Sequence, residues 1–323
     1  MSFSRALELA RAGRRFLVGC HRAPDADALG SALGLAVGLR ALGKEVTLYC
    51  PDDVPEILRF LPGVDRLERT LDGAGPWDAC FVMDLAAAVL LPDRFPERAR
   101  TGPVVVVDHH AAHDGFGDVV VREPASATAE IVVRMLDALG VQPLPAEAAR
   151  PLYAALVADT GGFRYAGTTP QTLRLGARLL EAGADPWETA YHLFEDLAPE
   201  RVALLRAVLG TLRRELDGRL ALVEVTRAML ERTGARDEMV EGMVNHARAV
   251  RGVEVAALLW ERPAAPGCAR TKVSLRSRGA VDVTRVATAL GGGGHRAAAG
   301  AEVDAPMDEV ASRLVSLVRP LLP

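Results

Sequence analysis

The sequence predicts an α/β protein in two parts, an N-terminal, largely parallel sheet flanked by helices and a smaller C-terminal α+β domain. Short apolar runs alternate with helical patterns over the first 165 residues. Half of the 323 residues are hydrophobic, and the chain is longer than one typical domain. We therefore expect a first domain over residues 1–185, a helical linker over 186–210 and a second domain over 211–323.

Four short apolar runs predict the strands of the first domain, because they are too short and too continuously apolar for anything but buried strands. Helices fit between several of them, and two end at a glycine (Gly43 and Gly140), which is a common helix stop. In a parallel sheet of this kind, ligands bind outside the carboxyl ends of the strands. The predicted strands are 16–20, 46–50, 79–83 and 104–107, and the predicted helices are 28–42 and 127–139.

A second pattern begins after a charged helical stretch over residues 187–209. It predicts a hairpin about Asp217-Gly218, strands over 253–260 and 272–275, and a glycine-rich turn at 291–294 before a run of small residues. These elements are enough for an α+β module with its own core.

Composition limits the classes of partner. The net charge of −4 argues against a protein that grips long nucleic acid through phosphates, although residues 211–300 carry a local surplus of basic side chains. No long apolar run or signal-peptide pattern is present, so we expect a cytoplasmic protein without a membrane partner. The four cysteines form no CxxC pair, and we expect no disulfide framework.

Metal-binding residue types follow three of the predicted strands directly. Because the carboxyl ends of parallel strands meet at one edge of a sheet, these side chains are expected to converge. An isolated aspartate here could simply cap a helix, and an isolated histidine could be solvated, but the combination favours a metal site. The candidate ligands are His21, Asp25, Asp27, Asp84, His109 and Asp159.

Nitrogen and oxygen ligands without a thiolate favour Mn²⁺, Mg²⁺ or a related ion over structural zinc. Such a set suits two ions that share a carboxylate and act on a phosphorus centre, and Asp84, alone on the middle strand end, is the expected bridge. Asp108 is expected to orient an imidazole, and His110 to contact phosphate or protonate the leaving oxygen. Catalysis is thus assigned to Asp84, His110 and Asp108, while His113 and Asp114 are weaker candidates.

The order of these motifs resembles that of the DHH phosphoesterase superfamily, whose name matches the triplet Asp108-His109-His110. His21-x3-Asp25-x-Asp27 comes first, then Asp84, the triplet, and Asp159 in Ala-Asp-Thr-Gly. The resemblance covers the first domain and implies two divalent ions, Mn²⁺ foremost, with Mg²⁺ or Co²⁺ as alternatives. It implies one ion at His21, Asp25 and Asp84, and the other at Asp27, Asp84, His109 and Asp159.

The run from Gly291 to Gly300 resembles the glycine-rich signature of the DHHA1 domain. Consecutive glycines let backbone N–H groups approach an anion, although such a run could also be a flexible surface loop. The segments 241–245 and 273–277 resemble the nanoRNase and pAp (3′-phosphoadenosine 5′-phosphate) phosphatase group of the superfamily. The resemblance and the glycine run together give the expected substrate-binding residues, which are Arg248, Arg276, Ser277, Gly293, Gly294, His295 and Arg296.

The resemblance implies a hydrolase that converts short oligoribonucleotides to 5′-mononucleotides and pAp to AMP and phosphate. Short RNA and small nucleotide phosphates are the expected partners, long duplex DNA is not, and a homodimer is left open. Three alternatives stay open as well: a phosphodiesterase of cyclic or linear dinucleotides, a single-strand DNA exonuclease of the same superfamily, and a non-catalytic nucleotide-binding regulator. Two further groups of the superfamily fit this chain less well. RecJ exonucleases carry further domains, and family II pyrophosphatases lack the glycine-rich histidine loop.

Overall fold

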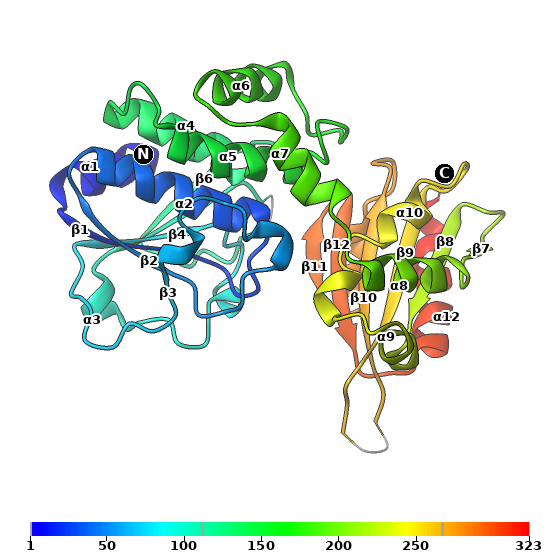
Figure 1. Ribbon diagram of the computed structural model, residues 1–323. Coiled ribbons are helices and arrows are strands. Elements are labelled where there is room, and N and C mark those ends of the chain that lie inside the picture. The colour runs from blue at the N-terminus through cyan, green and yellow to red at the C-terminus, as the bar shows by residue number, and fades with distance from the viewer. Residues whose placement is uncertain (1, 111–112, 266–267, 323) are drawn as a thin grey trace. The chain divides into compact units, whose positions relative to one another are not determined.

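The computed structural model describes residues 2–110, 113–265 and 268–322. It divides into two compact units, Met1–Asp196 and Leu197–Pro323 (Figure 1). Within the described residues, no helix is both long enough and apolar enough to cross a membrane.

The first unit is built on a six-stranded sheet in which every neighbouring pair of strands is parallel. The order β3-β2-β1-β4-β5-β6 reverses direction between β1 and β4, which makes this the switch point where α/β sheets bind ligands. The predicted strands are confirmed, and two short edge strands, β3 and β6, were not predicted. The bounds are β1 Arg15–Cys20, β2 Glu45–Tyr49, β3 Leu67–Glu68, β4 Ala79–Met83, β5 Val104–Asp108 and β6 Val119–Arg122.

Helices cover one face of this sheet and bury the larger core against it (Figure 1). The other face packs a smaller core that includes Leu17, Trp77 and Val106, with loop residues such as Leu71 and Phe95 over it. The longer helices are α1 Ser2–Ala12, α2 Ala26–Ala41, α4 Thr128–Leu139, α5 Ala146–Asp159 and α6 Pro170–Glu181. Shorter ones are η1 Glu56–Leu58, η2 Val64–Arg66, η3 Ala88–Leu90, α3 Arg98–Thr101, α7 Pro186–Ala190 and the π-helical η4 Tyr191–Glu195.

The second unit contains a mixed six-stranded sheet of order β11-β12-β10-β9-β8-β7, in which only β8 and β9 pair in parallel among the described strands. The predicted hairpin at Asp217-Gly218 is confirmed as the turn between β7 and β8. The predicted turn at 291–294 is partly wrong, since Gly293 and Gly294 already belong to the edge strand β11. The strands are β7 Arg213–Glu215, β8 Leu220–Val225, β9 Val255–Arg262, β10 Arg270–Ser277, β11 Gly293–His295 and β12 Ala298–Val303.

Two apolar clusters form the core of this second unit. Leu204 and Val208 of the first helix belong to one of them, so this part of the expected linker packs within the second unit. The helices are α8 Pro199–Leu209, α9 Arg227–Thr233, η5 Asp237–Val240, α10 Val244–Arg248, α11 Val283–Ala289, α12 Met307–Val318 and η6 Arg319–Leu321.

The close packing of α2 on α5 depends on glycine. A Cβ atom at Gly30 would lie 2.4 Å from the backbone oxygen of Pro151 and 2.9 Å from the Cβ atom of Ala155, both on α5. A backbone oxygen cannot rotate away, so a larger residue at Gly30 must push the two helices apart. This contact fixes the position of α5, whose last residue is Asp159.

We expect Gly30→Ala to lower the free energy of unfolding by about 2 kcal/mol, because the cost of overpacking exceeds the gain in helix propensity. Urea denaturation of the purified protein measures the change. Gly176→Ala in α6 is the matched control, since its Cβ atom would meet side-chain rings and no backbone, with Phe163 at 3.1 Å and Tyr153 at 4.0 Å. The control should change stability by less than about 1 kcal/mol. Equal stability of Gly30→Ala and wild type would contradict the packing argument.

Candidate metal centre

Three neighbouring strands deliver polar residues to the switch point of the first sheet. His21 follows β1, Asp84 follows β4, and Asp108 is the last residue of β5. Asp84 has a left-handed backbone with φ of 57°, and its amide donates to the carbonyl of Val107 at 2.8 Å, which extends the β4–β5 pairing. Aspartate tolerates this conformation better than most residues, and such backbone strain is typical of functional sites. The turn directs the Asp84 side chain toward both flanking strand ends.

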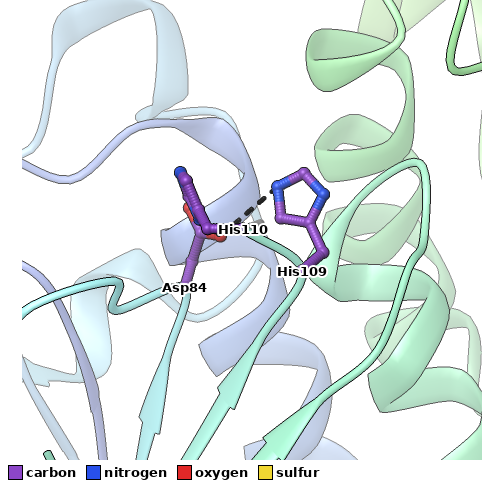
Figure 2. Close-up of side chains that lie close together, drawn as sticks. All are labelled: Asp84, His109 and His110. Atoms are coloured by element: carbon purple, nitrogen blue, oxygen red, sulfur yellow. Dashed lines mark ion pairs between the residues drawn. The ribbon is translucent and has the colours of Figure 1, made fainter. Parts of the chain in front are cut away.

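The two carboxylate oxygens of Asp84 face different histidines. Oδ2 lies 3.8 Å from Nε2 of His21, and Oδ1 lies 3.6 Å from Nε2 of His109. Figure 2 shows Asp84 with His109 and His110, and dashed lines mark the ion pairs among them. The Asp84 side chain is almost completely buried. One carboxylate is therefore shared between two groups of candidate ligands.

The six candidate ligands form two sets around Asp84. In the first set, Nε2 of His21 lies 3.9 Å from Oδ1 of Asp25. In the second, Nε2 of His109 lies 3.8 Å from Oδ2 of Asp27 and 3.4 Å from Oδ2 of Asp159. In each of the triplets His21–Asp25–Asp84 and Asp27–His109–Asp159, every residue offers one ligand atom, and these three atoms lie within 4.8 Å of one another. Asp159 reaches the site from the last residue of a helix, α5, and not from a strand end.

Both histidines are held in the orientation that a metal ligand needs. Nδ1 of His21 lies 2.8 Å from the carbonyl of Arg22, and Nδ1 of His109 lies 3.1 Å from the carbonyl of Ala125. A carbonyl can only accept, so each Nδ1 carries the proton and donates it there. This tautomer leaves the lone pair on Nε2, the atom that faces the carboxylates, and it is the arrangement usual for metal-bound histidines.

Asp27 and Asp84 are further fixed by the start of α4, where the cap residue Ala127 provides no side-chain hydrogen bond. The amides of Thr128 and Ala129 donate to Asp27 at 2.6 and 3.1 Å, so the carboxylate satisfies backbone groups that the helix leaves unpaired. The Thr128 hydroxyl donates to Oδ1 of Asp84 at 2.8 Å. Thr128 was not among the residues predicted for the site, although the expected helix start at 127 was a signal that could have found it.

Crowding of these carboxylates leaves a strong local excess of negative charge. Burial and the carboxylates of Asp84, Asp159 and Asp25 raise the pKa of Asp27 well above its ordinary value. Partial burial, with Asp84 and Asp25 nearby, raises the pKa of Asp159 to about 7. A cation would relieve this repulsion, and the donor set of oxygens and imidazole nitrogens suits hard or borderline divalent ions. The residues present therefore fit divalent metal ions.

His110 lies beside this group of ligands and is oriented by Asp108. Nδ1 of His110 lies 2.7 Å from Oδ1 of Asp108, which is fully buried, and 3.4 Å from Oδ1 of Asp84. Burial opposes the charged imidazolium, but the hydrogen bonds to Asp108 and Asp84 raise the pKa of His110 to about 11. Because Asp108 engages Nδ1, Nε2 is the nitrogen from which a proton can pass to a reacting group.

The two weaker candidates from the sequence have local roles. Asp114 accepts the amides of Ala88 and Phe116 at 2.7 and 2.9 Å and so braces the segment after Asp84. His113 accepts the amide of Gly115 at 2.8 Å through Nδ1.

The residues expected to bind substrate gather at one end of the sheet in the second unit. Arg276 and Ser277 end β10, and the Arg278 side chain next to them donates to the carbonyl of Arg248 at the end of α10. Nη2 of Arg276 lies 3.7 Å from the carboxylate of Glu241. Ser277 is buried, and its hydroxyl lies 3.5 Å from the carbonyl of Arg296. Arg248 and Arg276 are thus brought to the same end of the unit.

Two glycines of the run 291–294 are required by the close approach of the neighbouring strand β12. A Cβ atom at Gly292 would lie 2.0 Å from the carbonyl oxygen of Gly300, and one at Gly294 would lie 2.6 Å from Cα of Ala299. Gly293 meets no such obstacle. Nε of Arg296 donates to the carbonyl of Gly279 at 3.1 Å. The expectation for His295 concerns a side chain that lies outside the described part of the structure.

Comparison with known proteins agrees with this division of the chain. The model of the DHH family, N-terminal domain, matches residues 15–157, and the model of the DHHA1 domain matches residues 220–320. A solved structure of an exopolyphosphatase-related protein from Bacteroides fragilis superposes with a TM-score of 0.89 at 25% identity, covering 99% of this chain and 97% of that one.

Two curated relatives extend the comparison over most of the chain. The bifunctional oligoribonuclease and PAP phosphatase NrnA of Thermus thermophilus is 36% identical over 94% of this chain and 88% of its own length. The cyclic-di-AMP phosphodiesterase GdpP of Geobacillus thermodenitrificans is 28% identical over 92% of this chain and 46% of its own length. The chain therefore belongs to the DHH family, as a member in which a DHHA1 domain follows the DHH domain.

Proposed function

We propose that this protein is a two-metal phosphoesterase that hydrolyses short oligoribonucleotides to 5′-mononucleotides and pAp to AMP and phosphate. One observation carries the proposal: the two oxygens of Asp84 face separate sets of ligands, one at His21 and the other at His109. Such a carboxylate is suited to bridge two cations. His21, Asp25 and Asp84 would hold one ion. Asp27, His109 and Asp159 would hold the other, together with Asp84, whose Oδ1 faces His109.

When bound by these residues, two divalent ions would supply positive charge against a phosphoryl group and would lower the pKa of a water molecule toward neutral pH. Mn²⁺ is our first choice because the ligands combine imidazole with carboxylate, and Mg²⁺ and Co²⁺ are alternatives. The Asp108 carboxylate holds the His110 ring by Nδ1. His110 can then contact a phosphate oxygen or pass a proton from Nε2 to the leaving oxygen.

The substrate class is supported by the relatives and by the second unit. The Thermus thermophilus relative is named an oligoribonuclease and PAP phosphatase and aligns along 88% of its own length. Arg248 and Arg276 offer guanidinium groups, which pair with phosphate in a bidentate way. We assign these arginines, with Ser277, Gly293, Gly294, His295 and Arg296, to the binding of the substrate's phosphate or base.

Hydrolysis of a cyclic dinucleotide is the second candidate function, because GdpP aligns with 92% of this chain. The same metal centre would serve that reaction. The two candidate functions therefore differ only in the preferred substrate. Hydrolysis rates on a panel of substrates distinguish between them.

Purified protein with Mn²⁺ should hydrolyse pAp and a diribonucleotide faster than a cyclic dinucleotide, pyrophosphate or single-stranded DNA of about 20 nucleotides. Asp84→Asn should lower kcat/KM on every substrate by more than about 10³-fold, because it removes the charge of the shared carboxylate. Product release is followed by chromatography. Pyrophosphate as the sole substrate would contradict the proposed substrate class, and turnover retained in Asp84→Asn would contradict the two-metal centre.

Asp108→Asn tests the role of the buried acid beside His110. The amide has the shape of the carboxylate, and Oδ2 of Asp108 has no hydrogen-bond partner among the described residues, so the fold should tolerate the change. A neutral partner stabilises an imidazolium less well, and we expect kcat to fall about 10²-fold while KM and Mn²⁺ affinity stay close to wild type. Steady-state kinetics with pAp measure kcat and KM separately. An unchanged kcat would show that His110 does not depend on Asp108.

Arg276→Ala should chiefly weaken substrate binding, since the guanidinium is assigned to a phosphate. Loss of one charge-assisted contact predicts that KM for pAp rises about tenfold to 100-fold with little change in kcat. Arg270→Ala is the matched control, because Arg270 begins the same strand, β10, and pairs with Asp304. Equal KM values for both variants and wild type would remove Arg276 from the binding site.

A further inference from the structure

The loop that carries His21 and Asp25 is held to its surroundings by two backbone donors. The amide of Arg22 donates to the carbonyl of Leu90 at 2.7 Å, on the side of β4. The amide of Ala23 donates to Oδ2 of Asp52 at 2.6 Å, on the side of β2. The loop therefore spans two attachments, and only the second one uses a side chain as the acceptor.

Ala23 needs such an attachment because its backbone is left-handed, with φ of 50°. A side chain with a Cβ atom disfavours this region, and only the surroundings can hold an alanine in it. A carboxylate that accepts a short backbone hydrogen bond is among the stronger acceptors available for this purpose. The bend at Ala23 lies midway between His21 and Asp25, so it determines how these two side chains face one another.

Asp52 is itself well anchored. It follows β2, which pairs with β1 up to the register pair Gly19 and Tyr49. The amide of Cys50 donates to the carbonyl of Glu68 at 3.1 Å, and the Cys50 thiol donates to the carbonyl of Asp52 at 3.6 Å. The acceptor for Ala23 is thus attached to the sheet.

We propose that Asp52 is a positioning residue for the metal centre, which acts by holding Ala23 in its left-handed conformation and thereby setting the His21–Asp25 pair. The inference rests on the proposed function, because it supposes that these two residues bind a divalent ion. Among the described residues, Asp52 makes no hydrogen bond or ion pair with the side chain of a candidate ligand. Its effect is therefore exerted through the backbone.

Titration of Mn²⁺ into the apo-protein by calorimetry tests this role without any turnover. Asp52→Ala should weaken binding of the ion held by His21 and Asp25 about tenfold, as is typical when a partner behind the ligands is lost. Asp52→Asn keeps an acceptor oxygen and should bind nearly as wild type. Asp53→Ala is the matched control, because the neighbouring Asp53 is exposed and pairs with Arg69 alone among the described residues.

A second substitution separates the hydrogen bond from the charge of Asp52. Glycine adopts the left-handed region without penalty, so Ala23→Gly in the Asp52→Ala background should recover part of the lost affinity. Wild-type affinity in Asp52→Ala, an equal loss in Asp53→Ala, or no recovery in the double variant would each overturn the proposal. A wild-type protein that binds no Mn²⁺ would instead refute the proposed function, so the two failures are distinguishable.

Discussion

The mutual repulsion of carboxylates at the sheet's switch point is the constraint on which the rest of the first unit depends. Burial and like charges raise the pKa of Asp27 and of Asp159, while three imidazoles hold the pKa of Asp84 well below its ordinary range against the effect of its burial. Keeping these carboxylates together without a cation lowers the free energy of unfolding. The surrounding structure holds these carboxylates close together, in positions where bound cations would neutralise their negative charge.

Each part of the scaffold contributes one restraint to that end. Strand pairing places Asp84 between its neighbours, the start of α4 binds Asp27, and backbone carbonyls orient the two histidines. The close contact at Gly30 positions α5, and with it Asp159. Ligands from strand ends and helix ends therefore meet at one place because the packing of α2 sets the distance between them.

The sequence was most informative where one local signal was sufficient. Continuous apolar runs predicted the central strands, and the polar residues directly after them predicted the cluster of acidic and histidine side chains that could bind a metal. The strand β3 was missed because two residues are too short to show a pattern. The edge strand β6 was missed although Val119 and Val121 belong to the core of the first unit. Asp52 was missed because its contact with Ala23 joins residues 29 positions apart, which no local pattern encodes. The contact of Thr128 with Asp84 spans 44 positions, and only the expected helix start at 127 pointed to Thr128.

Anomalous diffraction from crystals grown with Mn²⁺ tests the central claim most directly. Data collected on both sides of the manganese absorption edge locate the ions independently of any assay. A two-metal centre bridged by Asp84 predicts two peaks about 3.5–4 Å apart, with one oxygen of Asp84 on each ion, His21 on the first and His109 on the second. A single peak, or two peaks with Asp84 on only one of them, would contradict it.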